Sequence, residues 1–264
     1  MVRPSALVSL IAAVGTTLGS CASLAADMPR SYTKAPPVYQ APPSWSGCYL
    51  GGNVGAGWDK TYSLGTEFAG TTFIPPFDYG GSSGSAVIGG GQIGCDYQFA
   101  SNWVIGIQGK ADFGKIASSN AVAPFPGITA SYQLKNTEEV TARLGYAVSP
   151  AVLAYAKGGV AFANASASAS ALPVLAETAS FTRTGYTFGG GLEWKFAPGW
   201  SVFGEYNYLD FGTKSSNLYA TGLIPAFGTA GALADTISLR LRSQEALAGV
   251  NYRFDWANPV AAKY

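Results

Sequence analysis

The side chains that could do chemistry in this chain are mostly carboxylates and cations, and they stand at alternate positions of apolar segments. The sequence holds 15 Asp and Glu, 16 Lys and Arg, three Cys and no His. Without His, the chain lacks the usual general base of Ser and Cys nucleophiles and the commonest nitrogen ligand of metals. We therefore expect no catalytic residue, no metal ligand and no cofactor. The near balance of charge also gives no reason to expect a nucleic-acid partner.

One glycine pattern resembles a nucleotide site in its letters. Gly89, Gly91 and Gly94 have the spacing of a dinucleotide-binding loop. Such a loop requires a helix after it, because the helix N-terminus binds the phosphates. Here the segment continues through Ile93 and Cys95 with the alternation of a strand. We interpret these glycines as positions where a strand bends and leaves room for long side chains.

Eight segments of the chain alternate between apolar and polar residues. They cover residues 46–59, 86–99, 103–114, 137–147, 152–163, 184–196, 200–211 and 239–254. A period of two residues predicts β-strands. In the last segment Ala248, Val250 and Tyr252 share one face, and Asn251 and Arg253 lie on the other. The sequence therefore predicts an all-β fold in which residues 246–254 pair with the first strand.

Connections between the segments alternate between short and long. Residues 100–102, 148–151 and 197–199 make short connections, whereas residues 60–85, 115–136, 164–183 and 212–238 make long ones rich in small residues and Pro. Outer-membrane barrels combine short periplasmic turns with long extracellular loops in this way. We therefore predict an eight-stranded antiparallel up-and-down transmembrane β-barrel in the cell outer membrane, with extracellular loops and both termini in the periplasm.

Tryptophans gather at the predicted periplasmic end. Five of the six lie beside the short connections or the termini, namely Trp45, Trp103, Trp194, Trp200 and Trp256. Amphipathic indoles favour the membrane–water interface. We predict that these five form one interfacial girdle.

The charged face must look into the lumen. Outward-facing Arg143 or Lys157 would each cost about 2–4 kcal/mol near the bilayer midplane. The predicted inward set is Asp59, Asp96, Asp112, Glu139, Glu193, Glu205, Lys110, Arg143, Lys157, Lys195 and Arg253. Because side chains just fill an eight-stranded barrel, we expect a lumen closed by ion pairs, with Glu139, Arg143, Glu193 and Glu205 at its centre. A charge-selective channel is the alternative.

The ends of the chain carry signals for export. Arg3, an apolar run and small residues before Ala26 predict a signal peptide over residues 1–25. A Pro-rich linker over residues 26–44, a barrel over residues 45–254 and a periplasmic tail over residues 255–264 follow. Residues 18–21 also match the lipidation site of bacterial lipoproteins, so Cys21 is either lipidated or removed by ordinary cleavage.

Cys48 and Cys95 stand at similar depths on the same face of the first two predicted strands. The periplasm permits disulfides, so these two residues form either a cross-strand disulfide or two lipid-facing thiols. The register of the two strands decides between these alternatives. On the last strand, Arg240 and Arg242 take the apolar parity, which indicates either a bulge or an extension beyond the membrane.

Several short motifs resemble those of the alphaproteobacterial outer-membrane immunogenic protein family, porin-like barrels related in architecture to OmpA-type barrels. The matching stretches are residues 45–55, 89–94, 143–146, 189–193, 205–206 and 249–254. The resemblance implies an outer-membrane location and a role as surface antigen, structural protein of the envelope or porin, and it implies no catalysis. Two departures are Cys48, where the family usually has an aromatic residue, and the tail after Phe254.

Three functions remain open on the sequence. The first is a structural and surface-antigen barrel, and the second is a channel for small solutes. The third is a binder that uses the aromatic residues of its predicted loops, which are Phe68, Phe73, Phe77, Tyr79, Phe125, Tyr132, Tyr219 and Phe227. The expected partners are outer-membrane lipid, lipopolysaccharide and the outer-membrane assembly machinery; the sequence does not indicate an oligomer.

Overall fold

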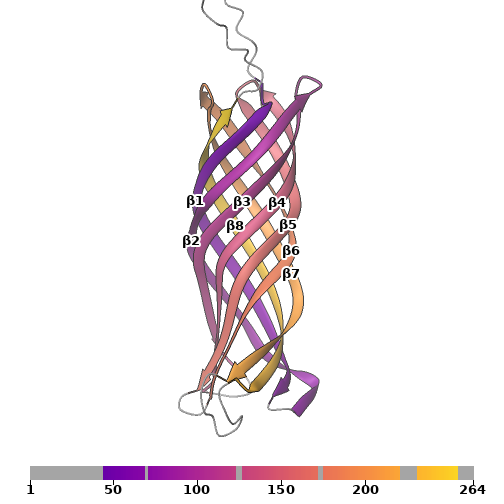
Figure 1. The fold of residues 1–264 in the computed structure, drawn as a ribbon, viewed down its shortest axis with the longest axis vertical. Coiled ribbons are helices and arrows are strands. Elements are labelled where there is room, and N and C mark those ends of the chain that lie inside the picture. The colour runs from indigo at the N-terminus through magenta and orange to yellow at the C-terminus, as the bar shows by residue number, and fades with distance from the viewer. Residues whose placement is uncertain (1–43, 69–70, 123–126, 172–174, 221–230, 255–264) are drawn as a thin grey trace, which may run out of the picture. The chain divides into compact units, whose positions relative to one another are not determined.

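The fold is a tall barrel of eight antiparallel strands (Figure 1). The computed structural model describes residues 44–68, 71–122, 127–171, 175–220 and 231–254. The strands are β1 (Gly47–Phe68), β2 (Thr71–Phe99), β3 (Trp103–Ala121), β4 (Thr129–Ser149), β5 (Val152–Ala171), β6 (Leu175–Ala197), β7 (Trp200–Ala220) and β8 (Leu233–Phe254). The described residues contain no helix long and apolar enough to span a membrane.

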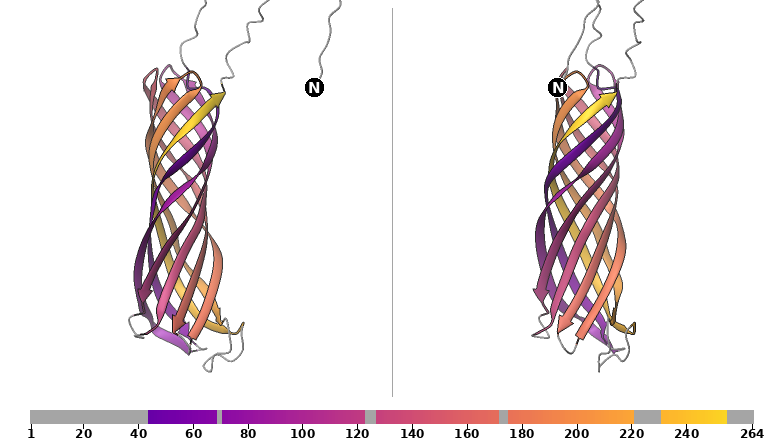
Figure 2. Two further views of the ribbon diagram at one scale, coloured as in Figure 1. Left: turned by 90° about the vertical axis from the view of Figure 1, so that its left-hand side faces the viewer. Right: turned by 60° about the vertical axis from the view of Figure 1, so that its left-hand side comes forward.

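Each strand pairs with its neighbour in sequence, and β8 pairs with β1 to close the ring. Asn251 lies opposite Gly51, and Phe254 lies opposite Cys48. This register confirms that residues 246–254 pair with the first strand. Turned views show the same closed cylinder with steeply tilted strands (Figure 2). We call the end with the turns between β2 and β3, β4 and β5, and β6 and β7 the turn end, and the opposite end the loop end.

The polarity of the barrel wall reverses between its two ends, as β5 illustrates. Near the turn end, Tyr155 and Lys157 are buried inside and Val160 is exposed outside. Nearer the loop end, Ala165 and Ala167 are buried inside, and the alternate positions are Ser and Asn. The turn-end half therefore has the wall of a membrane barrel, whereas the loop-end half has the apolar interior and polar exterior of a water-soluble barrel.

The predicted long loops are wrong for this reason. Residues 60–85, 115–136, 164–183 and 212–238 are largely strand, because each strand continues well past the apolar outer band. The strands are 19 to 29 residues long, about twice the 9–11 residues that cross a bilayer. Small and polar composition indicated loops, but the alternation of Ala and Ser over residues 163–170 of β5 is itself a strand pattern with its faces exchanged.

Trp45 does not belong to the predicted girdle. Trp103, Trp194 and Trp200 are exposed on the outer face near the turn end, but Trp45 is fully buried inside the barrel mouth. Its ring packs with Val104, Ala147, Leu153 and Tyr155. Cationic side chains hold it there, because Lys195 Nζ lies 4.1 Å from the ring centroid and the Arg253 guanidinium lies 5.3 Å from it.

Gly47 lets the chain pass from this mouth into β1. Its φ of 143° lies where L side chains are rarely found. A Cβ atom here would also approach the carbonyl oxygen of Phe254 to 2.6 Å. Glycine therefore allows the first strand to lie against the last one while Trp45 points into the lumen.

The extension beyond the apolar band explains Arg240 and Arg242. Both side chains are partly exposed and form ion pairs with Asp210 of β7, at 3.6 Å and 3.0 Å. An irregularity lies opposite them, between Asp210 and Thr213. Both predicted explanations thus apply, but the bulge is in β7 rather than in β8.

Several predictions lie outside the described residues. They are the signal peptide over residues 1–25, most of the linker over residues 26–44, the tail over residues 255–264, lipidation of Cys21, and the positions of Trp256, Phe125 and Phe227. The described strands belong to one compact unit within residues Pro42–Tyr264.

Candidate functional site

Two clusters of buried charge fill the turn-end half of the lumen. The turn-end ion cluster consists of Asp96, Arg143, Glu193 and Arg253, all buried. Arg143 Nη2 donates to Glu193 Oε2 at 3.0 Å, and Arg253 Nη2 donates to Asp96 Oδ2 at 2.9 Å. Longer contacts of 3.5 Å join Arg143 to Asp96 and Arg253 to Glu193. Two cations and two carboxylates thus balance one another.

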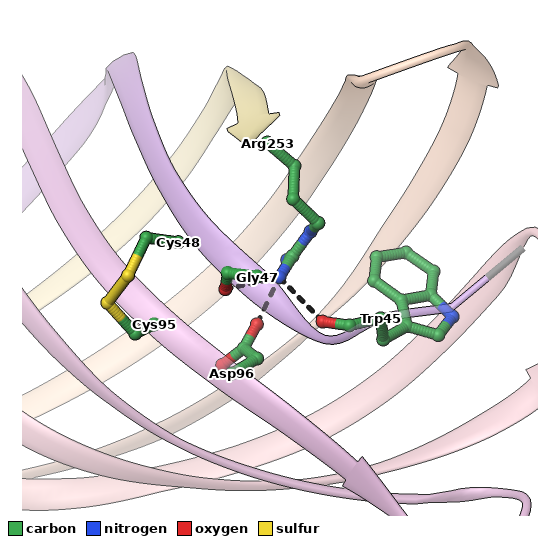
Figure 3. The surroundings of a disulfide bond; sticks show 6 residues. All are labelled: Trp45, Gly47, Cys48, Cys95, Asp96 and Arg253. Carbon is green, nitrogen blue, oxygen red and sulfur yellow. Dashed lines mark hydrogen bonds and ion pairs between the residues drawn. A yellow bond between two sulfur atoms is a disulfide. The ribbon is translucent and has the colours of Figure 1, made fainter. Parts of the chain in front are cut away.

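Aromatic residues and backbone oxygens complete this cluster. Arg143 donates to the hydroxyl of Tyr49, and its guanidinium lies 4.0 Å from the ring centroid of Tyr155. Arg253 Nη1 donates to the carbonyl oxygen of Trp45 at 2.8 Å (Figure 3). Bonds of this kind offset the cost of removing an arginine from water. They also fasten the segment before β1 to β8.

The central ion cluster consists of Lys110, Lys157 and four carboxylates, Asp112, Glu139, Glu205 and Glu245. The ammonium of Lys110 lies 2.8 Å from Asp112, 2.9 Å from Glu139 and 2.8 Å from Glu245. Lys157 lies 2.8 Å from Glu205. The cluster therefore holds two more carboxyl groups than ammonium groups. All six side chains are buried.

A cation from the protein lies within this acidic group. The carboxylate oxygens of Asp112, Glu139 and Glu245 all lie within 4.8 Å of one another, a spacing that could hold a metal ion. The Lys110 ammonium lies within ion-pair distance of all three. The arrangement therefore favours an internal salt bridge over a bound metal.

Side-chain amides join the two clusters. Asn251 donates to Glu193 at 3.1 Å and accepts a bond from Gln92 at 2.7 Å. Gln108 donates to Gln92 at 2.8 Å and accepts a bond from Lys157 at 3.4 Å. A continuous chain of polar contacts thus runs from one ion cluster to the other along the barrel.

The four residues expected at the centre divide between the two clusters. Arg143 and Glu193 belong to the turn-end cluster, and Glu139 and Glu205 belong to the central one. Lys195, which we expected among the inward charges, lies at the mouth, where Nζ donates to the carbonyl oxygen of Ser44 at 2.6 Å. The charges at 96, 110, 112, 143, 157 and 253 lie in the lumen as their parity indicates.

Glu245 was not among the predicted inward charges. It shares the inward parity of Leu247, Asn251 and Arg253 on β8, so extending that alternation two residues upstream would have found it. Gln92 and Gln108 share the inward parity of Asp96 and Lys110 on their strands, but the link that they form between the clusters depends on the register of β2 and β3.

Cys48 and Cys95 are joined in a disulfide across β1 and β2 (Figure 3). The two residues are direct partners in the strand register. Cys95 is exposed on the outer face, whereas the next residue, Asp96, is buried and binds Arg253. The bond therefore fixes, from outside, the strand pair that carries part of the turn-end cluster.

Apolar side chains close the lumen beyond the central cluster. Ile88, Ile116, Leu209, Phe211 and Leu241 are buried members of one apolar layer. A second apolar cluster follows toward the loop end. The lumen thus changes from charged to apolar along its length.

A narrow pocket opens within the loop end, which we call the loop-end pocket. Its cavity volume is about 20 Å³, which is room for about one water molecule. Apolar and aromatic side chains line most of it, and two carboxyl groups, Glu177 and Asp235, lie in its wall. Tyr79 and Tyr132, which we expected on loops, are instead buried in this wall.

Burial perturbs both acids of the pocket. Desolvation, with the nearby charge of Asp235, raises the pKa of Glu177 to about 8. Desolvation raises the pKa of Asp235 to about 6, although a hydrogen bond from Tyr79 opposes this rise. Neither carboxyl was singled out from the sequence, because both lie in segments that we interpreted as loops.

The chain is similar to known outer-membrane proteins. Residues 35–254 match the model of the outer membrane protein beta-barrel domain. The 31 kDa outer-membrane immunogenic protein of Brucella melitensis is 28% identical over 232 residues, which cover 80% of this chain and 88% of that protein. The 25 kDa outer-membrane immunogenic protein of Brucella abortus is 27% identical over 241 residues, covering 89% and 92%.

Solved barrels are similar at lower identity. The outer membrane protein OprG from Pseudomonas aeruginosa shares 9% identity with a TM-score of 0.46, covering 79% of this chain and 96% of that one. The family match covers nearly the whole barrel, and the resemblance seen in the short sequence motifs is confirmed by the Brucella relatives. The chain belongs to the outer-membrane β-barrel protein family.

Proposed function

We propose that this protein is a structural and surface-exposed barrel of the cell envelope, without catalytic activity, whose lumen is closed by its own side chains. The observation that carries the proposal is the continuous polar network from Asp96 to Glu245. It crosses the lumen, where Lys110 of β3 lies 3.7 Å from Glu205 of β7 on the opposite side of the ring, and it leaves its members buried. A barrel of eight strands has little interior space beyond its side chains.

Three successive barriers oppose the passage of a solute. Trp45 fills the turn-end mouth, the two ion clusters follow, and the apolar layer around Leu209 and Phe211 lies beyond them. An ion would have to separate buried pairs and then cross an apolar section without hydration. Each of these steps costs several kcal/mol.

Planar-bilayer recordings of the purified barrel test the closed lumen. We expect small or intermittent conductance from the wild type. Lys110→Met with Glu245→Gln should increase conductance, because this change removes cross-lumen ion pairs. Glu138→Gln removes an exposed carboxylate and should leave conductance unchanged. Large, steady pores from the wild-type monomer would contradict the proposal.

The second candidate is a channel for small solutes. The surplus of two carboxyl groups in the central cluster favours cations if that cluster opens. Steady, cation-selective currents that Glu205→Gln reduces would support this function. Binding through the exposed aromatic residues of the loop end, such as Tyr219, is the third candidate.

We further infer that the turn end faces the periplasm and the loop end faces the cell exterior. In this orientation residues 1–25 are the removed signal peptide and the chain termini stay in the periplasm. The apolar band contacts outer-membrane lipid, and the polar loop-end half stands among lipopolysaccharide sugars. The assembly machinery would act on β8.

Surface labelling tests this orientation. Ser168→Cys places a thiol on the exposed face of the loop-end half, and Ser101→Cys places one in an exposed turn. In intact cells an impermeant maleimide should label position 168 and leave position 101 unlabelled until the outer membrane is broken. The opposite pattern would reverse the orientation.

A further inference from the structure

We propose that three cationic side chains on the outer wall of the barrel, Lys60, Arg240 and Arg242, bind the phosphate of an outer-membrane lipid whose acyl chains lie on the apolar band beside them. We call these three residues the basic patch. The patch is separate from the ion clusters of the lumen and goes beyond the structural role proposed above. Only its assignment to the outer leaflet rests on the proposed orientation.

The strand register brings the three cations together. Lys60 of β1 is the direct partner of Arg242 of β8, and Arg240 lies two residues nearer the loop end on β8. Lys60 is exposed, and the side chains of Arg240 and Arg242 are 46% and 41% exposed. Like charges that lie directly opposite each other on one face of a sheet repel. A bound anion would remove this repulsion.

The protein neutralises only part of this charge. Asp210 of β7 pairs with both arginines, since its Oδ2 lies 3.0 Å from Arg242 Nε and 3.6 Å from Arg240 Nη2. Among the described residues, Lys60 has no ion-pair partner. Asp78, nearer the loop end on β2, accepts hydrogen bonds from a tyrosine hydroxyl and a backbone amide instead. Three cations thus share one carboxylate, which leaves a surplus of two positive charges.

Asp210 also orients the arginine that it binds. Its side chain is buried, and its Oδ1 accepts a hydrogen bond from the amide of Gly212 at 2.8 Å. The hydrogen bond from Arg242 uses only Nε, so the Nη groups of that guanidinium remain available to a ligand. Planar guanidinium groups bind two phosphate oxygens at once. A phosphate monoester carries about −1.5 to −2 charges at neutral pH, which matches the surplus of the patch.

The patch lies at the border of the apolar band. On β1, Val54 and Trp58 are exposed on the same face as Lys60, and Trp58 is two residues away from it. On β8 the outward positions change from Val250 near the turn end to Ser238 beyond the patch. Indole rings favour the level of the lipid headgroups. A lipid could therefore place its chains on the band and its phosphate on the patch, whereas free phosphate would gain only the second contact.

Native mass spectrometry of the full-length mature barrel in a neutral detergent tests the patch, with dioleoyl phosphatidic acid as the probe. We expect saturable binding of this lipid and much weaker binding of dioleoylglycerol, which has the chains without the phosphate. Inorganic phosphate at millimolar concentration should not displace the lipid. Binding in detergent is measured whatever the orientation or conductance of the barrel, so failure here is distinguishable from failure of the proposed function.

Two matched double variants localise the binding. Lys60→Gln/Arg240→Gln keeps the hydrogen bond between Arg242 and Asp210 and should weaken binding at least about tenfold, because two cations near the phosphate are lost. Lys115→Gln/Lys135→Gln removes two exposed lysines from β3 and β4 and should bind as the wild type does. Heat-modifiable gel mobility verifies that each variant is folded.

A measurement on the wild type locates the lipid without any variant. The indole N–H resonance of Trp58 should shift with phosphatidic acid, whereas that of Trp103, which is equally exposed near the turn end, should not. Five results would each overturn the proposal: no binding, equal binding of dioleoylglycerol, displacement by inorganic phosphate, equal losses in the two double variants, or equal shifts of the two indoles.

Discussion

Lys110 Nζ donates to Glu245 Oε2 at 2.8 Å and so joins β3 to β8 across the lumen. The two residues are 135 positions apart in the chain. Glu245 also accepts a bond from the hydroxyl of Thr137 on β4 at 3.0 Å. One buried carboxylate on β8 therefore connects to β3 and β4, although these strands lie far away in the sequence.

Lys110→Met should strongly destabilise the barrel. It leaves Asp112, Glu139 and Glu245 facing one another without the ammonium that contacts all three. Removing one partner of a buried pair costs about 3–5 kcal/mol. Urea unfolding followed by gel mobility measures the loss. Lys60→Met, at an exposed position on β1, should change stability by less than about 0.5 kcal/mol; equal losses would refute this role of Lys110.

Trp45→Ala should open the turn-end mouth and destabilise the barrel. The indole is fully buried and contacts two cationic side chains. Truncating a buried Trp costs about 3–5 kcal/mol. Trp194→Ala removes an indole that is exposed on the outer face and should cost less. The urea midpoints of the two variants give the comparison, and a larger loss at position 194 would contradict it.

The Cys48–Cys95 disulfide should leave no reactive thiol in a chain of residues 26–264. Denatured, unreduced protein should not react with maleimide, and reduction should expose two thiols per chain. The bond closes a loop of 47 residues, so its loss should cost about 2–4 kcal/mol. The double change Cys48→Ser/Cys95→Ser measures this cost. Two reactive thiols before reduction would show that the bond is absent.

Stability should fall as the pH rises from 5 to 8 and then level off. The folded barrel raises the pKa of Glu177 to about 8 and of Asp235 to about 6, because burial penalises their charged forms. The unfolded chain releases the same protons near pH 4. Between the unfolded and folded pKa values the folded state therefore holds more protons, and each rise of one pH unit costs about 1.4 kcal/mol per such group.

Glu177→Gln should remove most of this dependence. Urea midpoints at pH 5 and pH 9 for wild type and variant measure it, with Glu138→Gln as the control that keeps the wild-type slope. A wild-type midpoint that rises with pH over this interval would contradict the assignment of these acids.

Alternation determined the number of strands, the short connections determined their up-and-down order, and the cost of outward-facing charge determined the face that meets lipid. In the turn-end half, apolar residues such as Val250 must face the lipid and polar residues such as Asn251 must face the lumen. Membrane burial makes this pattern strict, because an outward charge is costly. The inward positions of Arg143, Glu193 and Arg253 followed directly from it.

Tertiary structure decided what local pattern leaves open. The burial of Trp45 depends on Arg253 and Lys195, which are distant in sequence, and the division of the charges into two clusters depends on strand register. The strands of the loop-end half were not predicted for two reasons. Ala faces inward and Ser faces outward there, which is the reverse of the polarity of a membrane barrel, and a segment rich in Ala and Ser also has the composition of a loop. Glu177 and Asp235 lie in one pocket because β6 and β8 both neighbour β7 in the barrel, and the proximity of two strands more than fifty residues apart is a property of the fold and not of either segment.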